Sequence, residues 1–230
     1  GLGAAELSPP PRGGPSAQGP RFDLPAPPRS WPAAQFSARI GGNRLLIQGA
    51  GGNTSIKIDN LLHVKASGTW LRDAAADDLF LPVPLDRLAR EKARALPRGE
   101  DLDPRAVAPG TAMTIIHGLL PRRVVVHVHS VNAITHAACA DGERAVAERL
   151  KGLGWRWIPY ARPGSRLARL FRTDIDVPVF VLANHGLVIQ ADGVAEAEAL
   201  LAEVERRLAV PARPSAEPRW QALEDLAGAT

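Results

Sequence analysis

Apolar and polar residues follow one another along the chain in patterns that predict seven short strands. The β-branched run 124–128 favours extended structure, and the alternation in 55–58 is typical of a half-buried strand. The run 61–65 follows the turn-forming pair Asp59-Asn60, so it should form a hairpin with 55–58. The expected strands lie at 55–58, 61–65, 79–83, 124–130, 155–160, 177–182 and 187–189.

Helical periodicity occupies most of the chain between these strands. It is clearest over 193–208, where Val194, Ala197, Leu201 and Val204 recur on one face. Strands and helices are interleaved without strict alternation, and hairpins are mixed in. We therefore expect a three-layer α/β/α sandwich with a central mixed, largely antiparallel sheet, not a purely parallel one. The other expected helices lie at 31–40, 85–96, 111–120, 133–140, 142–151 and 165–171.

Proline and glycine mark the limits of the expected folded part. Residues 1–30 are rich in both, so we expect a disordered arm there. A chain of 230 residues can bury one good-sized core, which we place in a single domain over 31–209. Residues 210–230 should form a linker and a short helix. The chain begins with Gly1, which is consistent with a fragment of a longer protein.

The composition is typical of a globular protein. Hydrophobic residues make up 45% of the chain, and no run of about 18 apolar residues is present to cross a membrane. No signal-peptide pattern occurs at the N-terminus, so we expect a cytoplasmic location. The single cysteine, Cys139, cannot form an internal disulfide, and its small apolar neighbours predict buried packing.

The charge distribution favours small anionic partners over nucleic acid. The formal net charge is +4, but the basic residues are mostly arginines spread along the chain, and aromatic residues amount to only 5%. A nucleic-acid surface would instead predict a basic cluster with interleaved aromatic residues. The densest basic region, 156–172, contains Tyr160 and is the one stretch that resembles such a cluster. We expect no nucleic-acid partner.

The candidate chemistry begins with two histidines on one predicted strand. Alternate residues of a strand share a face, so His127 and His129 should point the same way. Two imidazoles on one rigid face can form part of a metal site, and a third protein ligand is available in His185, which lies in a turn-like segment between two apolar runs. Three imidazoles with an open fourth position describe a catalytic metal centre. The alternative is that they are ordinary histidines of a half-buried strand.

Two glycine-containing loops flank the predicted hairpin. The first, 49–55, combines glycines with Asn53 and two hydroxyl side chains, so its backbone could approach an anion closely. Its glycine spacing matches neither a P-loop nor a dinucleotide-binding fingerprint, and the alternative is a simple turn between two strands. The second loop, 66–69, contains Ser67 and Gly68. Two such loops at one end of a hairpin could hold one phosphate together.

Four motifs in this order resemble the class II aldolase/adducin family. They are Gly-Gly-Asn-Thr-Ser at 51–55, Ala-Ser-Gly-Thr at 66–69, His-Val-His-Ser at 127–130 and Asn-His-Gly-Leu at 184–187. The resemblance covers roughly residues 40 to 208, and four ordered motifs are far more specific than any one of them. The family includes fuculose and rhamnulose phosphate aldolases, ribulose phosphate epimerases and methylthioribulose phosphate dehydratases.

The resemblance implies a metal and a substrate class. His127, His129 and His185 would bind one Zn²⁺, or another divalent metal, in each subunit. The metal would polarise the carbonyl of a ketose phosphate and stabilise the enediolate that forms when a C–C bond breaks. The partners implied are a sugar phosphate or sugar acid and other copies of the chain, since relatives are commonly tetramers.

The same resemblance places the substrate phosphate on Asn53, Ser67 and Gly68, with Thr111 at a position where the family often has a serine. Loop amides and hydroxyls would hold the phosphate and so fix the carbon skeleton relative to the metal.

One departure from the family pattern affects the mechanism. The aldolases have a glutamate four residues before a histidine on the helix that leads to the His-x-His strand, and counting back from His117 gives Met113. A thioether cannot transfer a proton. The proton carrier would then be another group, such as Tyr160, Asp141 or a metal-bound water, or the protein is not an efficient aldolase.

We therefore carry three hypotheses. The first is a zinc-dependent lyase of the aldolase type that cleaves a C–C bond of a phosphorylated sugar or sugar acid. The second is an epimerase, dehydratase or decarboxylase that uses the same enediolate, and decarboxylation is attractive because it needs no base to abstract a proton. The third is a catalytically impaired adducin-like binding module, although such a scaffold has no need of three metal-binding histidines.

Overall fold

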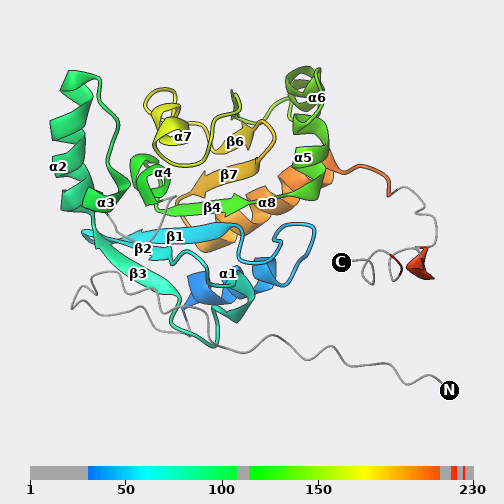
Figure 1. Cartoon of the computed structure of the whole chain (residues 1–230), viewed down its shortest axis with the longest axis horizontal. Helices are drawn as coiled ribbons and strands as arrows, with labels where there is room; N and C mark the ends of the chain where they lie inside the picture. The colour runs from blue at the N-terminus through cyan, green and yellow to red at the C-terminus, as the bar shows by residue number, and fades with distance from the viewer. Residues whose placement is uncertain (1–30, 108–113, 213–218, 222–224, 226–230) are drawn as a thin grey trace.

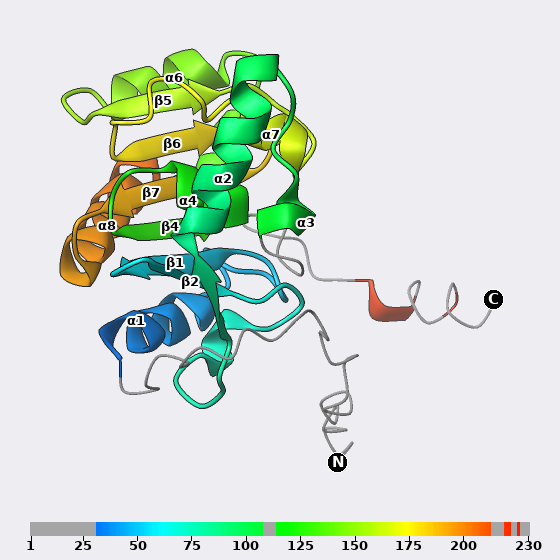
Figure 2. The ribbon, with the colours of Figure 1, turned by 90° about the vertical axis from the view of Figure 1, so that its left-hand side faces the viewer.

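The structure, a computed structural model, describes residues 31–107, 114–212, 219–221 and 225. Within them, seven strands form a single sheet in the order β3-β2-β1-β4-β7-β6-β5 (Figure 2). Neighbouring strands are antiparallel except β5 and β6, which are parallel. The predicted mixed, largely antiparallel sheet is confirmed. The strands are β1 (Asn53–Ile58), β2 (Leu61–Lys65), β3 (Phe80–Pro84), β4 (Val124–Val128), β5 (Trp155–Ile158), β6 (Val179–Leu182) and β7 (Gly186–Ala191).

Helices cover both faces of this sheet (Figure 1). Helices α1, α5, α6 and α8 contribute to a core on one face, and α2, α4 and α7 to a core on the other. The predicted three-layer sandwich is therefore confirmed. No helix in the described ranges is both long and apolar enough to cross a membrane. The α-helices are α1 (Pro32–Gly41), α2 (Leu85–Ala95), α3 (Pro104–Val107), α4 (Thr114–Leu119), α5 (Val131–Ala137), α6 (Gly142–Arg149), α7 (Ser165–Arg169) and α8 (Val194–Leu208), and two 3-10 helices are η1 (Leu71–Asp73) and η2 (Leu96–Arg98).

The central strand β4 contributes side chains to both cores, because its residues point alternately to the two faces of the sheet. Val124, Val126 and Val128 pack into the core beneath α1, α5 and α8, and Val125 packs into the opposite core with α4. Every residue of β4 is buried. Because successive side chains of a strand point to opposite faces, His127 lies on the same side as Val125, at the end of the strand that leads into α5.

The hairpin of β1 and β2 forms as expected and places the two loops together. Ser55 pairs with Val64 and Ile58 with Leu61, and the turn between them uses Asp59 at a φ of 50°. The glycine-containing loop enters β1, and the loop 66–69 leaves β2, so both lie at the end of the hairpin opposite its turn. In this position they are next to the end of β4, because Asn53 pairs with His127.

Three local features differ from what the sequence suggested or were not foreseen from it. Residues 44–46 form a turn before the glycine loop, because Leu46 and Ile47 donate backbone hydrogen bonds back to Asn43. The segment between α2 and α4 contains η2 and α3. Cys139 is exposed, not buried, because it lies just beyond α5, whose buried positions are Ala133, His136 and Ala137.

Candidate active site

Three histidines from separate parts of the chain converge at the end of β4. His127 is in β4, His129 lies one residue beyond the end of this strand, and His185 is in the turn between β6 and β7. Their ring centroids are 5.0 Å (127 to 129), 4.8 Å (127 to 185) and 5.3 Å (129 to 185) apart. The sequence predicted this convergence, although it placed His129 within the strand.

The turn that carries His185 is tightly fixed against β4. Asn184 has a φ of 53° and Gly186 a φ of 148°, both in the region that favours glycine. A Cβ at position 186 would lie 2.2 Å from the carbonyl oxygen of Val128. Only glycine therefore allows β7 to begin so close to the end of β4, and this close approach brings His185 beside the other two rings.

The ring nitrogens are suited to a divalent metal. His127 donates from Nδ1 to the carbonyl of Leu187 at 2.9 Å, which leaves its Nε2 unprotonated in the neutral ring. One nitrogen from each of the three histidines lies within 4.8 Å of the others. Nitrogens around a tetrahedral zinc ion are about 3.4 Å apart, so small ring rotations would complete the site. The three residues could therefore hold one metal ion.

Burial favours the neutral, metal-binding form of all three imidazoles. Desolvation lowers the pKa of His127 well below its ordinary value, lowers that of His129, and lowers that of His185 to about 4. Neighbouring positive charge adds to the effect: His129 and His185 lower the pKa of His127, His129 lowers that of His185, and Lys65 lowers that of His129. At neutral pH the cluster presents uncharged nitrogen donors, which is the state that binds a metal without first releasing protons.

The histidines form one wall of a cavity of about 240 Å³, and the two predicted loops form much of the rest. Asn53, Ser67 and Gly68, the described residues to which the resemblance assigned the substrate phosphate, all contribute to its lining. Thr111 and Met113, the other two positions assigned by the resemblance, lie outside the described residues. The described lining contains no carboxylate and consists of Ala50, Gly51, Gly52, Asn53, Lys65, Ala66, Ser67, Gly68, His127, His129, Pro163 and His185.

The glycines of the first loop are required by close contacts. A Cβ at Gly51 would lie 2.8 Å from Nδ1 of His129. A Cβ at Gly52, whose φ is +63°, would lie 2.2 Å from Cδ1 of Ile47 and 2.9 Å from the carbonyl oxygen of His127. The loop therefore packs directly against the histidine cluster, which argues against a loose turn.

A buried relay fixes the orientation of Asn53. The amide oxygen of Asn53 can only accept, so Nε2–H of His117 donates to it at 2.7 Å. Nδ1 of His117 then accepts from the hydroxyl of Ser55 at 2.7 Å. Burial lowers the pKa of His117 to about 3, which keeps the ring neutral and preserves this arrangement. The relay leaves the NH₂ group of Asn53 to donate to a ligand.

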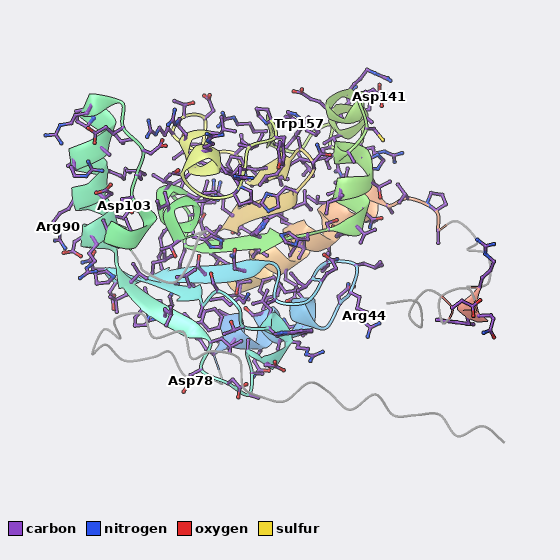
Figure 3. All side chains as sticks on the ribbon, in the orientation of Figure 1. Arg44, Asp78, Arg90, Asp103, Asp141 and Trp157 are labelled. Atoms are coloured by element: carbon purple, nitrogen blue, oxygen red, sulfur yellow. The ribbon has the colours of Figure 1, made fainter. Side chains whose placement is uncertain are left out.

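Two other candidate proton carriers lie apart from this cavity. The side chain of Tyr160 is 64% exposed and does not contribute to the described lining. Asp141 forms an ion pair with Arg144 at 2.8 Å, and Figure 3 shows it beside α6. Within this single chain, neither side chain reaches the three histidines.

A larger cavity of about 650 Å³ lies over α2, but its chemistry is unlike that of an active site. Its lining residues include Arg90, which is paired with Asp86, and Arg94, which is paired with Glu91. No imidazole contributes to it among the described residues. The smaller cavity, with the three histidines, is the candidate active site.

Two side chains of this site were not predicted from the sequence. Lys65, at the end of β2, lines the cavity and donates from Nζ to the carbonyls of Ala50 and Gly52. His117 was treated only as a reference point for counting back to position 113. No local signal in the sequence marks Lys65, because strand alternation places its side chain on the face of the sheet opposite Val64 and Val125.

Comparison with known proteins agrees with the motifs. The family model for the class II aldolase and adducin N-terminal domain matches residues 34–210. The chain is 28% identical over 170 residues to the uncharacterized oxidoreductase YuxG of Bacillus subtilis (strain 168), a match that covers 65% of this chain. The matched part spans only 24% of that relative's length.

Solved structures show the same fold. The N-terminal class II aldolase domain of a conserved protein from Thermoplasma acidophilum has a TM-score of 0.62 at 23% identity, over 81% of this chain and 93% of that one. The sugar-phosphate aldolase from Thermotoga maritima has a TM-score of 0.59 at 15% identity, over 76% and 89%. The L-fuculose-1-phosphate aldolase from Thermus thermophilus has a TM-score of 0.54 at 15% identity, over 86% and 94%. This chain belongs to the class II aldolase and adducin family.

Proposed function

We propose that the protein is a metal-dependent lyase of the class II aldolase type, which cleaves a C–C bond of a phosphorylated sugar or sugar acid. The observation that carries this proposal is one small cavity that combines three neutral imidazoles with two hydroxyl- and glycine-containing loops. A bound Zn²⁺ ion would polarise the substrate carbonyl and stabilise the negative charge that develops as the bond breaks. The protein's own groups would supply binding and orientation.

The assignment of roles follows from the residues that line the cavity. His127, His129 and His185 would hold the metal, with His127 oriented by its hydrogen bond to a backbone carbonyl. The amide of Asn53 and the loop residues Ser67 and Gly68 would bind the phosphate or carboxylate of the substrate. The cavity volume of about 240 Å³ suits a small substrate, because drug-sized ligands occupy clefts of roughly 300–1,000 Å³.

A decarboxylase is the second candidate, and the composition of the cavity supports it. No carboxylate contributes to the described lining, so the glutamate base expected of an aldolase is not found among these residues. Loss of CO₂ leaves an electron pair on carbon without removal of a proton by a base. The same metal site and loops would serve this reaction.

The test is a panel of sugar phosphates and sugar acids incubated with zinc-loaded protein, with aldehyde and CO₂ measured in parallel. We expect aldehyde release from a ketose phosphate, and we expect this activity to disappear after treatment with a chelator and to return with zinc. Release of CO₂ without aldehyde would support the decarboxylase instead. A metal-loaded protein that releases neither product from any member of the panel would contradict both assignments.

A further inference from the structure

A buried lysine lies beneath the two loops of the cavity. The side chain of Lys65 is only 2% exposed, although lysine is rarely buried without a charged partner. Its Nζ donates to the carbonyl of Ala50 at 2.9 Å and to that of Gly52 at 3.1 Å. Lys65 also contributes to the lining of the 240 Å³ cavity together with the three histidines, and its charge lowers the pKa of His129.

The two carbonyl contacts allow the amino group of Lys65 to change its protonation state in place. An ammonium has three N–H groups, and a neutral amine has two N–H groups and a lone pair. Both forms can satisfy the two carbonyls, so a proton can be gained or lost at the third position without breaking either hydrogen bond. No further hydrogen-bond partner of Nζ occurs in the described part of the chain.

The surroundings of Lys65 favour the neutral amine more than water does. Burial lowers its pKa from the ordinary 10.5 to about 8. No ion pair holds it in the charged form among residues 31–107 and 114–212. The titratable groups that share its cavity are His127, His129 and His185, whose neutral forms are favoured by burial, so none of them offers Lys65 a negative charge.

We propose that Lys65 is the acid–base residue of this cavity, in place of the glutamate that aldolases use. The inference rests on the proposed function. In aldol cleavage, neutral Nζ takes the proton of the substrate hydroxyl, whose oxygen becomes the aldehyde oxygen as the C–C bond breaks. The electron pair of that bond remains on the carbonyl-bearing fragment, and the ammonium returns the same proton to its carbon. In a decarboxylation only the second transfer occurs, and water restores the proton on Nζ.

The first part of the test measures the lysine itself and needs no substrate. The chain contains four lysines, so protein that carries ¹³C at the Cε of lysine should give four resolvable NMR signals. The signal that disappears in Lys65→Arg identifies Lys65. In the zinc-loaded protein we expect this signal to titrate at least one pH unit below the ordinary lysine pKa of 10.5. Titration of Lys65 at an ordinary lysine pKa would overturn the proposal.

The second part measures proton transfer to carbon with dihydroxyacetone phosphate as the probe. Zinc-loaded wild-type protein in D₂O should replace a C3 hydrogen of the probe with deuterium, followed as loss of the ¹H NMR signal. We expect Lys65→Met to lower the exchange rate by about 100-fold or more, the usual contribution of an acid–base group. Lys65→Arg keeps the charge and the donors but cannot readily become neutral, so it should be equally slow.

Lys57 supplies a matched control. Its Nζ also donates to two backbone carbonyls, those of Leu120 and Arg122, and burial also lowers its pKa to about 8, but it does not contribute to the lining of the cavity. Lys57→Met should therefore lower stability and leave the exchange rate within a few-fold of wild type. Zinc content and melting temperature, measured for every variant, separate loss of proton transfer from loss of the site.

The outcomes distinguish this inference from the proposed function. If wild-type protein exchanges the probe and Lys65→Met or Lys65→Arg does so at the same rate, Lys65 is not the acid–base residue, and the proposed function stands. If Lys65→Met is slow and Lys65→Arg restores exchange, the lysine has only a structural role, and the proposal is again overturned. If zinc-loaded wild type neither exchanges the probe nor cleaves any compound of the panel, the proposed function fails, and the role of Lys65 fails with it.

Discussion

Replacement of His185 by alanine should lower the zinc affinity of the protein by about 10²–10⁴-fold. The reason is that each protein ligand contributes roughly 3–5 kcal/mol to the free energy of zinc binding. The residue contributes one of the three nitrogens that lie within 4.8 Å of one another. Loss of one donor leaves only two protein ligands, which cannot define a tetrahedral site with one open position. Competition with a chromophoric zinc chelator at about pH 7.5, where all three imidazoles are neutral, measures the change directly.

His136 provides the control for this variant. It is also a buried histidine, but its Nε2–H donates to the carbonyl of Leu208, away from the cluster. His136→Ala should therefore lower stability without changing zinc affinity. If His185→Ala and His136→Ala bind zinc as tightly as wild type does, the three histidines do not form the metal site.

Gly186→Ala should destabilise the metal-free protein by roughly 3–5 kcal/mol, because overpacking and backbone strain add at this position. The new Cβ would lie 2.2 Å from the carbonyl oxygen of Val128 and 3.1 Å from the Cα of His129. Both atoms belong to backbone that pairs with or borders β7, so they cannot move aside as a flexible side chain would. Urea-induced unfolding followed by circular dichroism measures the loss.

Gly193 is the matched glycine for this comparison. It precedes α8 with extended backbone at a φ of −147°, and a Cβ there would meet no atom within 4 Å. Gly193→Ala should therefore change the free energy of unfolding by less than about 1 kcal/mol, the cost of replacing the N-cap glycine of α8 by alanine. Equal unfolding midpoints for Gly186→Ala and wild type would show that the turn after His185 is not held by this contact.

The sequence alone was sufficient for the seven strands of the sheet, for most of the helices and for the convergence of the three histidines. Strand signals in β4 and β7 were strong because β-branched and apolar residues fill them, and the turn at Asn184 and Gly186 contains the residues that tolerate a positive φ. These local signals bring His127 and His185 to the same edge once the strands pair. The three histidines could therefore be identified from the sequence as candidate metal ligands.

The remainder of the site depended on contacts between residues distant in the chain. The hydrogen bonds of Lys65 to the carbonyls of Ala50 and Gly52 exist only in the folded chain. The residues around position 65 do not predict them. The relay through His117 likewise joins α4 to two residues of β1. The prediction that Cys139 is buried was wrong, because its small apolar neighbours do not show that α5 ends before residue 139.

The central claim is that His127, His129 and His185 bind one divalent metal ion together. Anomalous diffraction at the zinc K-edge from crystals of zinc-loaded protein tests it most directly. We predict one strong peak per chain, about 2.0–2.1 Å from a nitrogen of each of the three rings, with a further position open to solvent. Zinc bound at another place, or ligated by fewer than these three histidines, would contradict the claim.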